Sequence, residues 1–117
     1  MMAPTVVLQD GVARLVLGSA GSNRIRSALL QVIVNVVDRG MAAQEAVDVP
    51  RLHYAADGLY AEPGIPLAEL LATGLDLTPF RDRNLFFGGC QAVARDPATG
   101  ELSGGADPRR GGGVAVA

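Results

Sequence analysis

A long, mostly apolar run at residues 25–37 follows directly on a segment of small residues. Apolar side chains recur in it at helical spacing and also fill most of the other positions, which is typical of a helix buried on nearly all sides. Several of these residues are β-branched and lower the helix propensity, so tertiary packing has to hold the helix. We predict a helix over residues 24–38 that ends before Gly40, a residue type favoured just past a helix C-terminus.

The segment before this helix, residues 18–24, has the sequence Gly-Ser-Ala-Gly-Ser-Asn-Arg. Its two glycines can turn the chain through conformations that a Cβ atom forbids. Ser22 or Asn23 is the predicted N-cap, because either side chain can accept a hydrogen bond from a free amide of the first turn. Such a turn directs unpaired N–H groups to one spot beside the positive end of the helix dipole. The segment therefore favours an anion, or an oxygen that becomes negative during a reaction.

The rest of the chain alternates between short strands and short helices. Apolar runs between turn residues predict strands over 5–8, 13–17, 51–55, 59–62, 85–95 and 101–103, an irregular strand around 75–80 and a terminal strand over 114–117. Short helices are predicted over 42–47 and 66–72. Asp10-Gly11 predicts a hairpin turn, Gly88-Gly89 a bulge, and residues 104–113 a glycine-rich loop. The pattern indicates a single α+β domain, residues 1–117, with an antiparallel sheet and packed helices.

The composition is that of a chain that can bury a core. Of its 117 residues, 49% are hydrophobic and 19% charged, and the mean hydropathy of +0.25 is high for a small domain. The net charge is −2 and no basic stripe follows any predicted face, which argues against nucleic-acid binding. Residues 27–37 are too few to cross a membrane, and residues 1–9 lack the features of a signal peptide. We expect neither nucleic acid nor membrane as a partner, and the compartment stays open.

Three residues with reactive side chains have a catalytic and a structural interpretation. Cys90 is the single cysteine, so no intrachain disulfide can form. It is a candidate nucleophile with His53 as base, but a lone cysteine in a strand is more typical of a small core residue. Thr5 as an N-terminal nucleophile is disfavoured, because it precedes a strand. His53 has no partner at metal-ligand spacing, so we expect a structural histidine, no metal ion and no cofactor.

Two charged corners predict ion pairs. Arg51 follows a proline, and an interior arginine at such a corner has to pair with an acid or donate to backbone carbonyls. Residues 107–110 (Asp-Pro-Arg-Arg) are interpreted as a turn locked by an Asp–Arg contact, with anion binding as the alternative.

Several segments, taken in order, resemble the γ-glutamyltranspeptidase (glutathione hydrolase) family. Residues 4–11 (PTVVLQDG) are similar to the family's Pro-Thr-Ile-Val…Asp-Gly strand pair, and residues 18–25 (GSAGSNRI) to its Gly-Ser-Pro-Gly-Gly-Ser-Arg-Ile turn. Residues 30–38 (LQVIVNVVD) resemble Leu-Gln-Val-Ile-Xaa-Asn-Val-Ile-Asp, residues 45–53 (EAVDVPRLH) resemble Glu-Ala-Val-Asp-Ala-Pro-Arg-Phe-His, and residues 104–110 (GGADPRR) resemble Gly-Ala-Ser-Asp-Pro-Arg-Arg. The resemblance covers essentially the whole chain and is to the C-terminal portion of the family's small subunit.

The resemblance implies a part of an N-terminal-nucleophile hydrolase with a four-layer αββα sandwich. In such enzymes a precursor cuts itself, and the newly exposed threonine attacks a γ-glutamyl amide. It implies that this threonine, the large subunit and the residues that hold the substrate lie upstream of this chain. We therefore assign no catalytic side chain here and expect the isolated chain to be inactive. The resemblance also implies oxyanion-hole N–H groups at Gly21 and Ser22, with Ala20 in place of the family's proline.

Two functions of different classes follow. The first is the C-terminal part of a γ-glutamyltransferase or glutathione hydrolase, which acts on γ-glutamyl compounds such as glutathione. The second is a catalytically inactive interaction or oligomerisation module from a truncated gene or a cloned domain; a related acylase acting on another amide is a third possibility. One face of the sheet would be uncovered, so we expect the missing N-terminal part with the large subunit, or a second copy, to cover it. The acceptor and the oligomeric state stay open.

Overall fold

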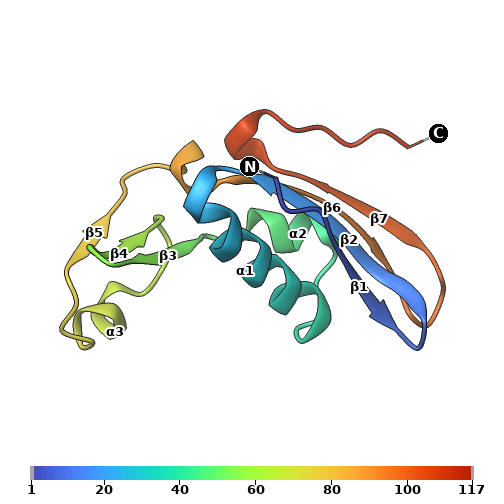
Figure 1. The fold of residues 1–117 in the computed structure, drawn as a ribbon, viewed down its shortest axis with the longest axis horizontal. Coiled ribbons are helices and arrows are strands. Elements are labelled where there is room, and N and C mark those ends of the chain that lie inside the picture. Colours follow the sequence, from blue (N-terminus) through green and yellow to red (C-terminus); the bar gives the residue numbers. More distant parts are fainter. Residues whose placement is uncertain (1, 117) are drawn as a thin grey trace.

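A four-stranded antiparallel sheet forms the larger part of the structure, a computed structural model that describes residues 2–116 (Figure 1). Its strands are β1 (Thr5–Gln9), β2 (Val12–Ala20), β6 (Gly89–Arg95) and β7 (Leu102–Ala106), in the spatial order β1-β2-β6-β7. Asp10 and Gly11 join β1 to β2 with φ values of 54° and 77°, as the tight hairpin turns that match strand twist require. The predicted hairpin is thereby confirmed.

Two helices cover one face of this sheet. The helices α1 (Ile25–Val37) and α2 (Ala43–Asp48) lie against its strands in Figure 1, and the core between the layers consists of aliphatic and small side chains such as Leu15, Leu17 and Val32. Gly105 of β7 permits the close approach of α2, because a Cβ atom there would lie 2.5 Å from the carbonyl oxygen of Ala43. The α+β fold with helices packed on an antiparallel sheet is confirmed.

A smaller three-stranded sheet lies at the other end of the molecule, at the left of Figure 1. It contains β3 (Leu52–Ala55), β4 (Gly58–Ala61) and β5 (Leu77–Pro79); β3 and β4 are antiparallel, whereas β4 and β5 are parallel. The short helix α3 (Leu67–Leu71) lies in the connection from β4 to β5. Three 3-10 turns, at Ser22–Arg24, Leu85–Phe87 and Pro108–Arg110, lie around the region where the two sheets approach each other.

The second face of the four-stranded sheet carries no helix within residues 2–116. Val6, Val16 and Val93 lie side by side in register across β1, β2 and β6 on this face, with exposed fractions of 56%, 46% and 47%. Leu102 of β7, which pairs with Arg95, exposes 72% of its surface. We call this surface (Val6, Val16, Val93 and Leu102) the open sheet face. None of the helices in residues 2–116 combines the length and the hydropathy that a bilayer span requires.

Three local predictions are wrong. A single strand with a bulge was predicted over 85–95, but Leu85–Phe87 is a 3-10 helix and β6 begins only at Gly89. The helix forms because the Asn84 side chain accepts a hydrogen bond of 2.8 Å from the amide of Phe86, which caps the turn. The predicted loop 104–113 is shorter, because β7 continues to Ala106. Residues 112–116 form no strand, and residue 117 of that prediction lies outside the described residues.

Candidate functional site: the corner between β2 and α1

The corner between β2 and α1 is built by two residues with positive φ. Gly21 has φ 134° and Ser22 has φ 57°, so the chain turns sharply directly after Ala20, the last residue of β2. A Cβ atom on Gly21 would lie 2.8 Å from the Cα atom of Gly88. Both the backbone conformation and the contact with Gly88 therefore require glycine at position 21.

The predicted N-cap at Ser22 or Asn23 is wrong. Ser22–Arg24 forms a 3-10 turn, Arg24 precedes the first residue of α1, and no side chain caps the helix. An N-cap residue has extended backbone dihedrals, whereas Ser22 is in the left-handed region. A non-glycine residue in that region is strained, and such strain is found at functional sites when the surrounding structure imposes it.

The amides of Gly21 and Ser22 are available to a ligand. Outside the regular strand ladders of residues 2–116, neither N–H donates a hydrogen bond to a carbonyl or side-chain oxygen, whereas the carbonyl of Gly21 accepts one of 3.3 Å from the amide of Arg24. Ser22 is exposed and Gly21 is partly exposed. Two adjacent N–H groups without an acceptor, on a fixed backbone at the entrance to a helix, are suited to bind a negatively charged oxygen.

A cavity of about 360 Å³ lies beside this corner, and its walls include Gly18, Ser19, Ala20 and Gly89. Arg110 also lines it. The Arg110 side chain crosses Gly89, where a Cβ atom would overlap it, and its Nη2 atom lies 3.8 Å from the position of a Gly21 Cβ atom. A positive charge without an ion-pair partner in residues 2–116 thus lies close to Gly21. It raises the local potential for an anion at the corner.

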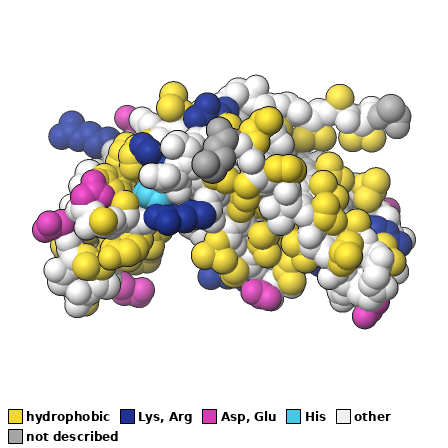
Figure 2. Space-filling view, in the orientation of Figure 1, with side chains coloured by type: hydrophobic (Ala, Val, Ile, Leu, Met, Phe, Trp, Pro, Cys, Tyr) yellow, Lys and Arg dark blue, Asp and Glu magenta, His cyan; other side chains and the backbone are white. Residues whose placement is uncertain are grey.

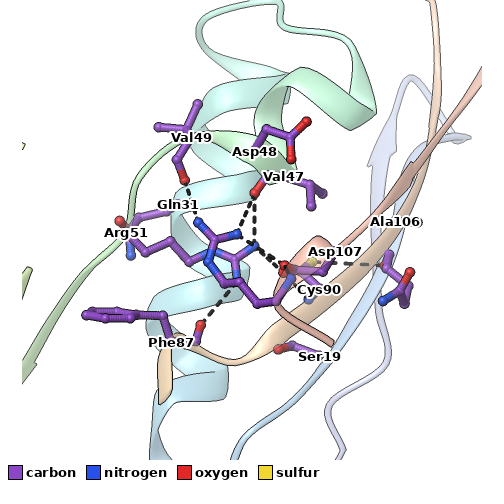
Figure 3. A network of polar contacts seen from close by, with 12 residues as sticks. Ser19, Gln31, Val47, Asp48, Val49, Arg51, Phe87, Cys90, Ala106 and Asp107 are labelled. Atoms are coloured by element: carbon purple, nitrogen blue, oxygen red, sulfur yellow. Dashed lines mark hydrogen bonds and ion pairs between the residues drawn. The ribbon is translucent and has the colours of Figure 1, made fainter. Parts of the chain in front are cut away.

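A buried network of charges holds the chain behind the corner (Figure 3). Asp107 accepts a hydrogen bond of 2.7 Å from the amide of Cys90, and its other oxygen accepts one of 2.9 Å from the amide of Arg109. The Arg51 guanidinium lies 2.7 Å from the Asp107 carboxylate and donates to the carbonyl of Phe87 at 3.1 Å. The two ends of the segment 87–90 are therefore both fixed by this network. Because this segment contains Gly88, the network supports the residue against which Gly21 packs.

The second half of the network pairs Arg109 with Glu62. Arg109 lies 2.5 Å from the Glu62 carboxylate, and it donates to the carbonyls of Val47 and Val49 at 3.0 and 3.1 Å. Burial opposes the charge of Arg109, but the hydrogen bond to Glu62 and the charge of Glu62 outweigh burial and raise the pKa of Arg109. The pKa of Arg51 is lowered by burial and by the neighbouring charge of Arg109. Each guanidinium has a carboxylate and backbone carbonyls around it, as buried charges require.

The two predictions about charged corners are confirmed. Arg51 pairs with an acid and donates to backbone carbonyls, and Asp107 locks its turn through Arg109 at 3.2 Å. Glu62 was not singled out from the sequence. It follows the buried strand β4, and nothing in the local pattern distinguishes it from a surface glutamate. Its ion-pair partner Arg109 comes from a segment far along the chain.

The residues with reactive side chains are held in structural positions. Cys90 is fully buried, and burial raises the pKa of its thiol to about 11. His53 Nδ1 lies 2.8 Å from the Ser27 hydroxyl, and Thr5 donates to the carbonyl of Ala3 at 3.1 Å. Within residues 2–116 no group of three or more histidine, cysteine or carboxylate side chains is arranged to hold a metal ion. Neither Cys90 nor Thr5 is placed as a nucleophile.

Comparison with known proteins decides the family. The sequence model of the gamma-glutamyltranspeptidase family matches residues 1–117. The chain belongs to the γ-glutamyltranspeptidase family. It is 36% identical over 112 residues to the glutathione hydrolase proenzyme of Escherichia coli, covering 92% of this chain and 19% of that protein. The chain thus spans about a fifth of the length of the curated relatives it matches.

Solved structures agree with the family. The structure of a variant of the Helicobacter pylori γ-glutamyltranspeptidase matches with a TM-score of 0.80 and 35% identity, over 92% of this chain and 60% of that chain. A cephalosporin acylase from Bacillus halodurans matches with a TM-score of 0.84 and 30% identity, over 96% of this chain and 22% of that one. Proteins named for different amide substrates therefore share this fold, and the chain corresponds to only part of each.

Proposed function

We propose that this chain is the C-terminal part of the small subunit of a γ-glutamyl hydrolase or transferase, and that the amides of Gly21 and Ser22 form its oxyanion hole. The observation that carries the proposal is the pair of adjacent N–H groups without an acceptor, on a backbone held in place by Gly88 and the buried charges behind it. Donors that are fixed before the reaction stabilise a developing oxyanion without a reorganisation cost.

The chain's contribution to the reaction is electrostatic. When a nucleophile from the rest of the proenzyme adds to the amide carbonyl of the substrate, negative charge develops on the carbonyl oxygen. The amides of Gly21 and Ser22 would donate hydrogen bonds to this oxygen, and Arg110 adds a positive charge nearby. These interactions are stronger for the tetrahedral intermediate than for the planar amide, so they lower the barrier rather than only tighten binding.

The open sheet face supports the proposal that a further part of the enzyme packs on this chain. Val6, Val16 and Val93 form a continuous apolar row without a covering layer in residues 2–116. Val114 packs over Gly104 at the edge of the same face, because a Cβ atom on Gly104 would lie 2.6 Å from a Val114 methyl group. Exposed apolar surface of this kind is typical of an interface. We assign it to the N-terminal part of the proenzyme.

The γ-glutamyl specificity rests on the relatives' names, since an oxyanion hole serves any amide. The relatives include glutathione hydrolases and acylases, and the acyl group is chosen by residues outside this chain under our proposal. The glutathione-type substrate is favoured because most of the matching curated proteins are named glutathione hydrolases.

A chimaera tests the proposal. The chain would replace the matching C-terminal segment of the Escherichia coli glutathione hydrolase proenzyme, and hydrolysis of a γ-glutamyl anilide would be measured. We expect turnover by the chimaera and none by the isolated chain. Gly21→Ala keeps the N–H group but cannot keep the Gly21 backbone angle, so it should displace the donors and lower kcat by about 10²–10³-fold with little change in KM. Gly40→Ala, which also changes a glycine with positive φ, is the matched control. If the Gly21→Ala and Gly40→Ala chimaeras were both correctly processed and equally active, the oxyanion role of Gly21 would be refuted.

A further inference from the structure

Gln91 places a polar side chain beside the apolar residues of the open sheet face. It lies two residues before Val93 on β6, so both side chains point to the same face of the sheet. Its neighbours in register are Gly18 on β2 and Ala106 on β7, which carry no polar side chain. In Figure 2, hydrophobic side chains gather over the strands at the right of the molecule, below the extended tail. Apolar packing alone does not explain an amide at this position.

The side-chain amide of Gln91 is free to bind. Gln91 is exposed, and within residues 2–116 its side chain has no hydrogen-bond partner, whereas its backbone carbonyl faces the sulfur of Cys90. The glycine-rich tail passes over it at Gly112, where a Cβ atom would lie 2.8 Å from both Nε2 and Oε1 of Gln91. Glycine at position 112 therefore leaves the amide accessible. A glutamine amide offers both donors and an acceptor.

Gln91 lies on the route from the sheet face to the β2–α1 corner. It lines the cavity of about 360 Å³ beside the corner, together with Gly89. It also lines the hollow along Val16 and Val93 on the open sheet face. Gly89 pairs with Ala20, the last residue before the corner. A segment that reaches the corner from the sheet face therefore passes over the Gln91 amide.

The nucleophile has to take this route under the proposed function. It belongs to the N-terminal part of the proenzyme, which covers the open sheet face. The reacting carbonyl carbon is bonded to the oxygen that the corner holds, and a nucleophile must come within about 3–3.5 Å of that carbon to attack. The segment that carries the nucleophile then covers Gln91 and removes water from its amide. An amide that is covered without a hydrogen-bond partner is costly, so the segment has to supply one.

Another glutamine of this chain shows how such an amide binds a strand. The Gln31 side chain accepts a hydrogen bond of 3.0 Å from the amide of Leu52 and donates one of 2.8 Å to the carbonyl of the same residue. Leu52 begins β3, an edge strand of the small sheet. In an extended strand the N–H and C=O groups of one residue point to the same side, so one glutamine can pair with both. Gln91 has the same two groups free.

We propose that Gln91 positions the nucleophile. Its side-chain amide pairs with the N–H and C=O groups of one residue in the extended segment that carries the nucleophile, and it holds this segment over the β2–α1 corner. Gln91 acts through the segment and does not touch the reacting atoms, so it is a positioning residue. This role rests on the proposed function, because both the nucleophile and the covering part come from outside this chain.

Two substitutions at Gln91 in the chimaera separate hydrogen bonding from packing. Gln91→Met keeps the length of the side chain without the amide, and Gln91→Asn keeps the amide on a shorter side chain. Hydrolysis of a γ-glutamyl anilide is measured per processed subunit. We expect Gln91→Met to lower kcat about 10²-fold with little change in KM, since a misplacement of about 1 Å costs that much, and Gln91→Asn to lose less. Gln9→Met, at the far end of the same sheet, is the matched control and should keep the kcat of the unaltered chimaera.

The stability of the isolated chain distinguishes positioning from a structural role. The Gln91 amide has no partner in the chain, so Gln91→Met should leave the urea midpoint of the isolated chain unchanged. A kcat for Gln91→Met that equals that of the unaltered chimaera, or exceeds that of Gln91→Asn, would overturn the positioning role. Gly21→Ala is measured in the same chimaera. Its loss of activity beside an unaffected Gln91→Met would leave the oxyanion proposal standing while this one fails.

Discussion

The guanidinium of Arg51 lies 2.7 Å from the carboxylate of Asp107, and both side chains are almost completely withdrawn from solvent. Arg51 precedes β3 and Asp107 follows β7, so this contact joins the small sheet to the large one. Both residues also bind the backbone of the segment 87–90. The pair therefore connects the stability of the domain to the geometry of the β2–α1 corner.

Removing the charge of Asp107 should be costly. Asp107→Asn leaves Arg51 buried without a carboxylate, and loss of one member of a buried pair destabilises by about 3–5 kcal/mol. The free energy of unfolding in urea measures the effect. Asp48→Asn is the control, because the side chains of the Asp48–Arg83 pair are 42% and 43% exposed and solvent-accessible pairs contribute about 0–1 kcal/mol. Similar losses in the two variants would contradict the structural role given to Asp107.

Stability should fall in acid through the same carboxylate. Burial alone would raise the pKa of Asp107, but the amide of Cys90 and the charge of Arg51 outweigh it, and the folded-state pKa lies below the ordinary value of 3.8. A depressed pKa stabilises the folded state above the unfolded-state pKa, and this contribution is lost as the pH falls through the folded-state value. Unfolding of the native chain and of Asp107→Asn, compared from pH 7 downward, should show their difference shrinking below about pH 4. A constant difference would be inconsistent with this titration.

Gly21 should tolerate no side chain. The φ of 134° and the 2.8 Å distance from a Cβ position to the Gly88 Cα atom both oppose Gly21→Ala. We expect it to destabilise by about 1–3 kcal/mol more than Gly40→Ala, since strained backbone positions cost that amount. Gly40 also has positive φ, but nothing lies within 4 Å of its Cβ position. Chemical denaturation of both variants gives the comparison, and equal losses would remove the steric argument.

Replacing Ser22 with glycine should stabilise the folded protein. Its φ of 57° is in the left-handed region, which costs a residue with a Cβ atom about 1–2 kcal/mol. Glycine is also more flexible in the unfolded chain, so the net gain for Ser22→Gly should be about 0.5–1 kcal/mol. Ser22→Ala keeps the Cβ atom and should give no gain. Thermal unfolding of the two variants distinguishes backbone strain from any effect of the lost hydroxyl.

Cys90 should be unreactive in the folded protein. Burial raises the pKa of its thiol to about 11, and only the thiolate attacks thiol reagents. At pH 8 we expect labelling by an aromatic disulfide reagent to be far slower in buffer than in urea, where the same cysteine is exposed. Rapid labelling of the native chain would show that the core opens around β6.

The sequence predicts the elements whose signals are local. The hairpin turn at Asp10-Gly11 and the helix behind the corner follow from turn chemistry and apolar periodicity within a few residues. The pairing of Arg51 with an acid follows from the rule that a buried arginine must be paired or hydrogen-bonded. What the sequence does not contain is the partner: Glu62 and Asp107 reach the arginines only after distant segments have come together.

Two of the wrong predictions share a cause. Serine is a residue type favoured at the N-cap. However, Gly21 packs on Gly88, and the turn that this requires holds Ser22 in the left-handed region, where it cannot cap the helix. Glycines at 104 and 105 suggest a loop, yet they continue β7 because they pair with Val93 and Ala92 of β6. In both cases a contact between distant residues overrides a local preference.

The pairing of Ala20 with Gly89 has a consequence for folding. The chain leaves the large sheet after Ala20 and returns at Gly89, directly opposite, and the helices α1 and α2 and the whole small sheet form between these two points. The β1–β2 hairpin can form early, but closing this long excursion costs chain entropy before the β2–β6 contacts repay it. The corner lies at the point of closure. We therefore expect its two amides to reach their final geometry among the last events of folding, so that the formation of the proposed anion site marks completion of the domain.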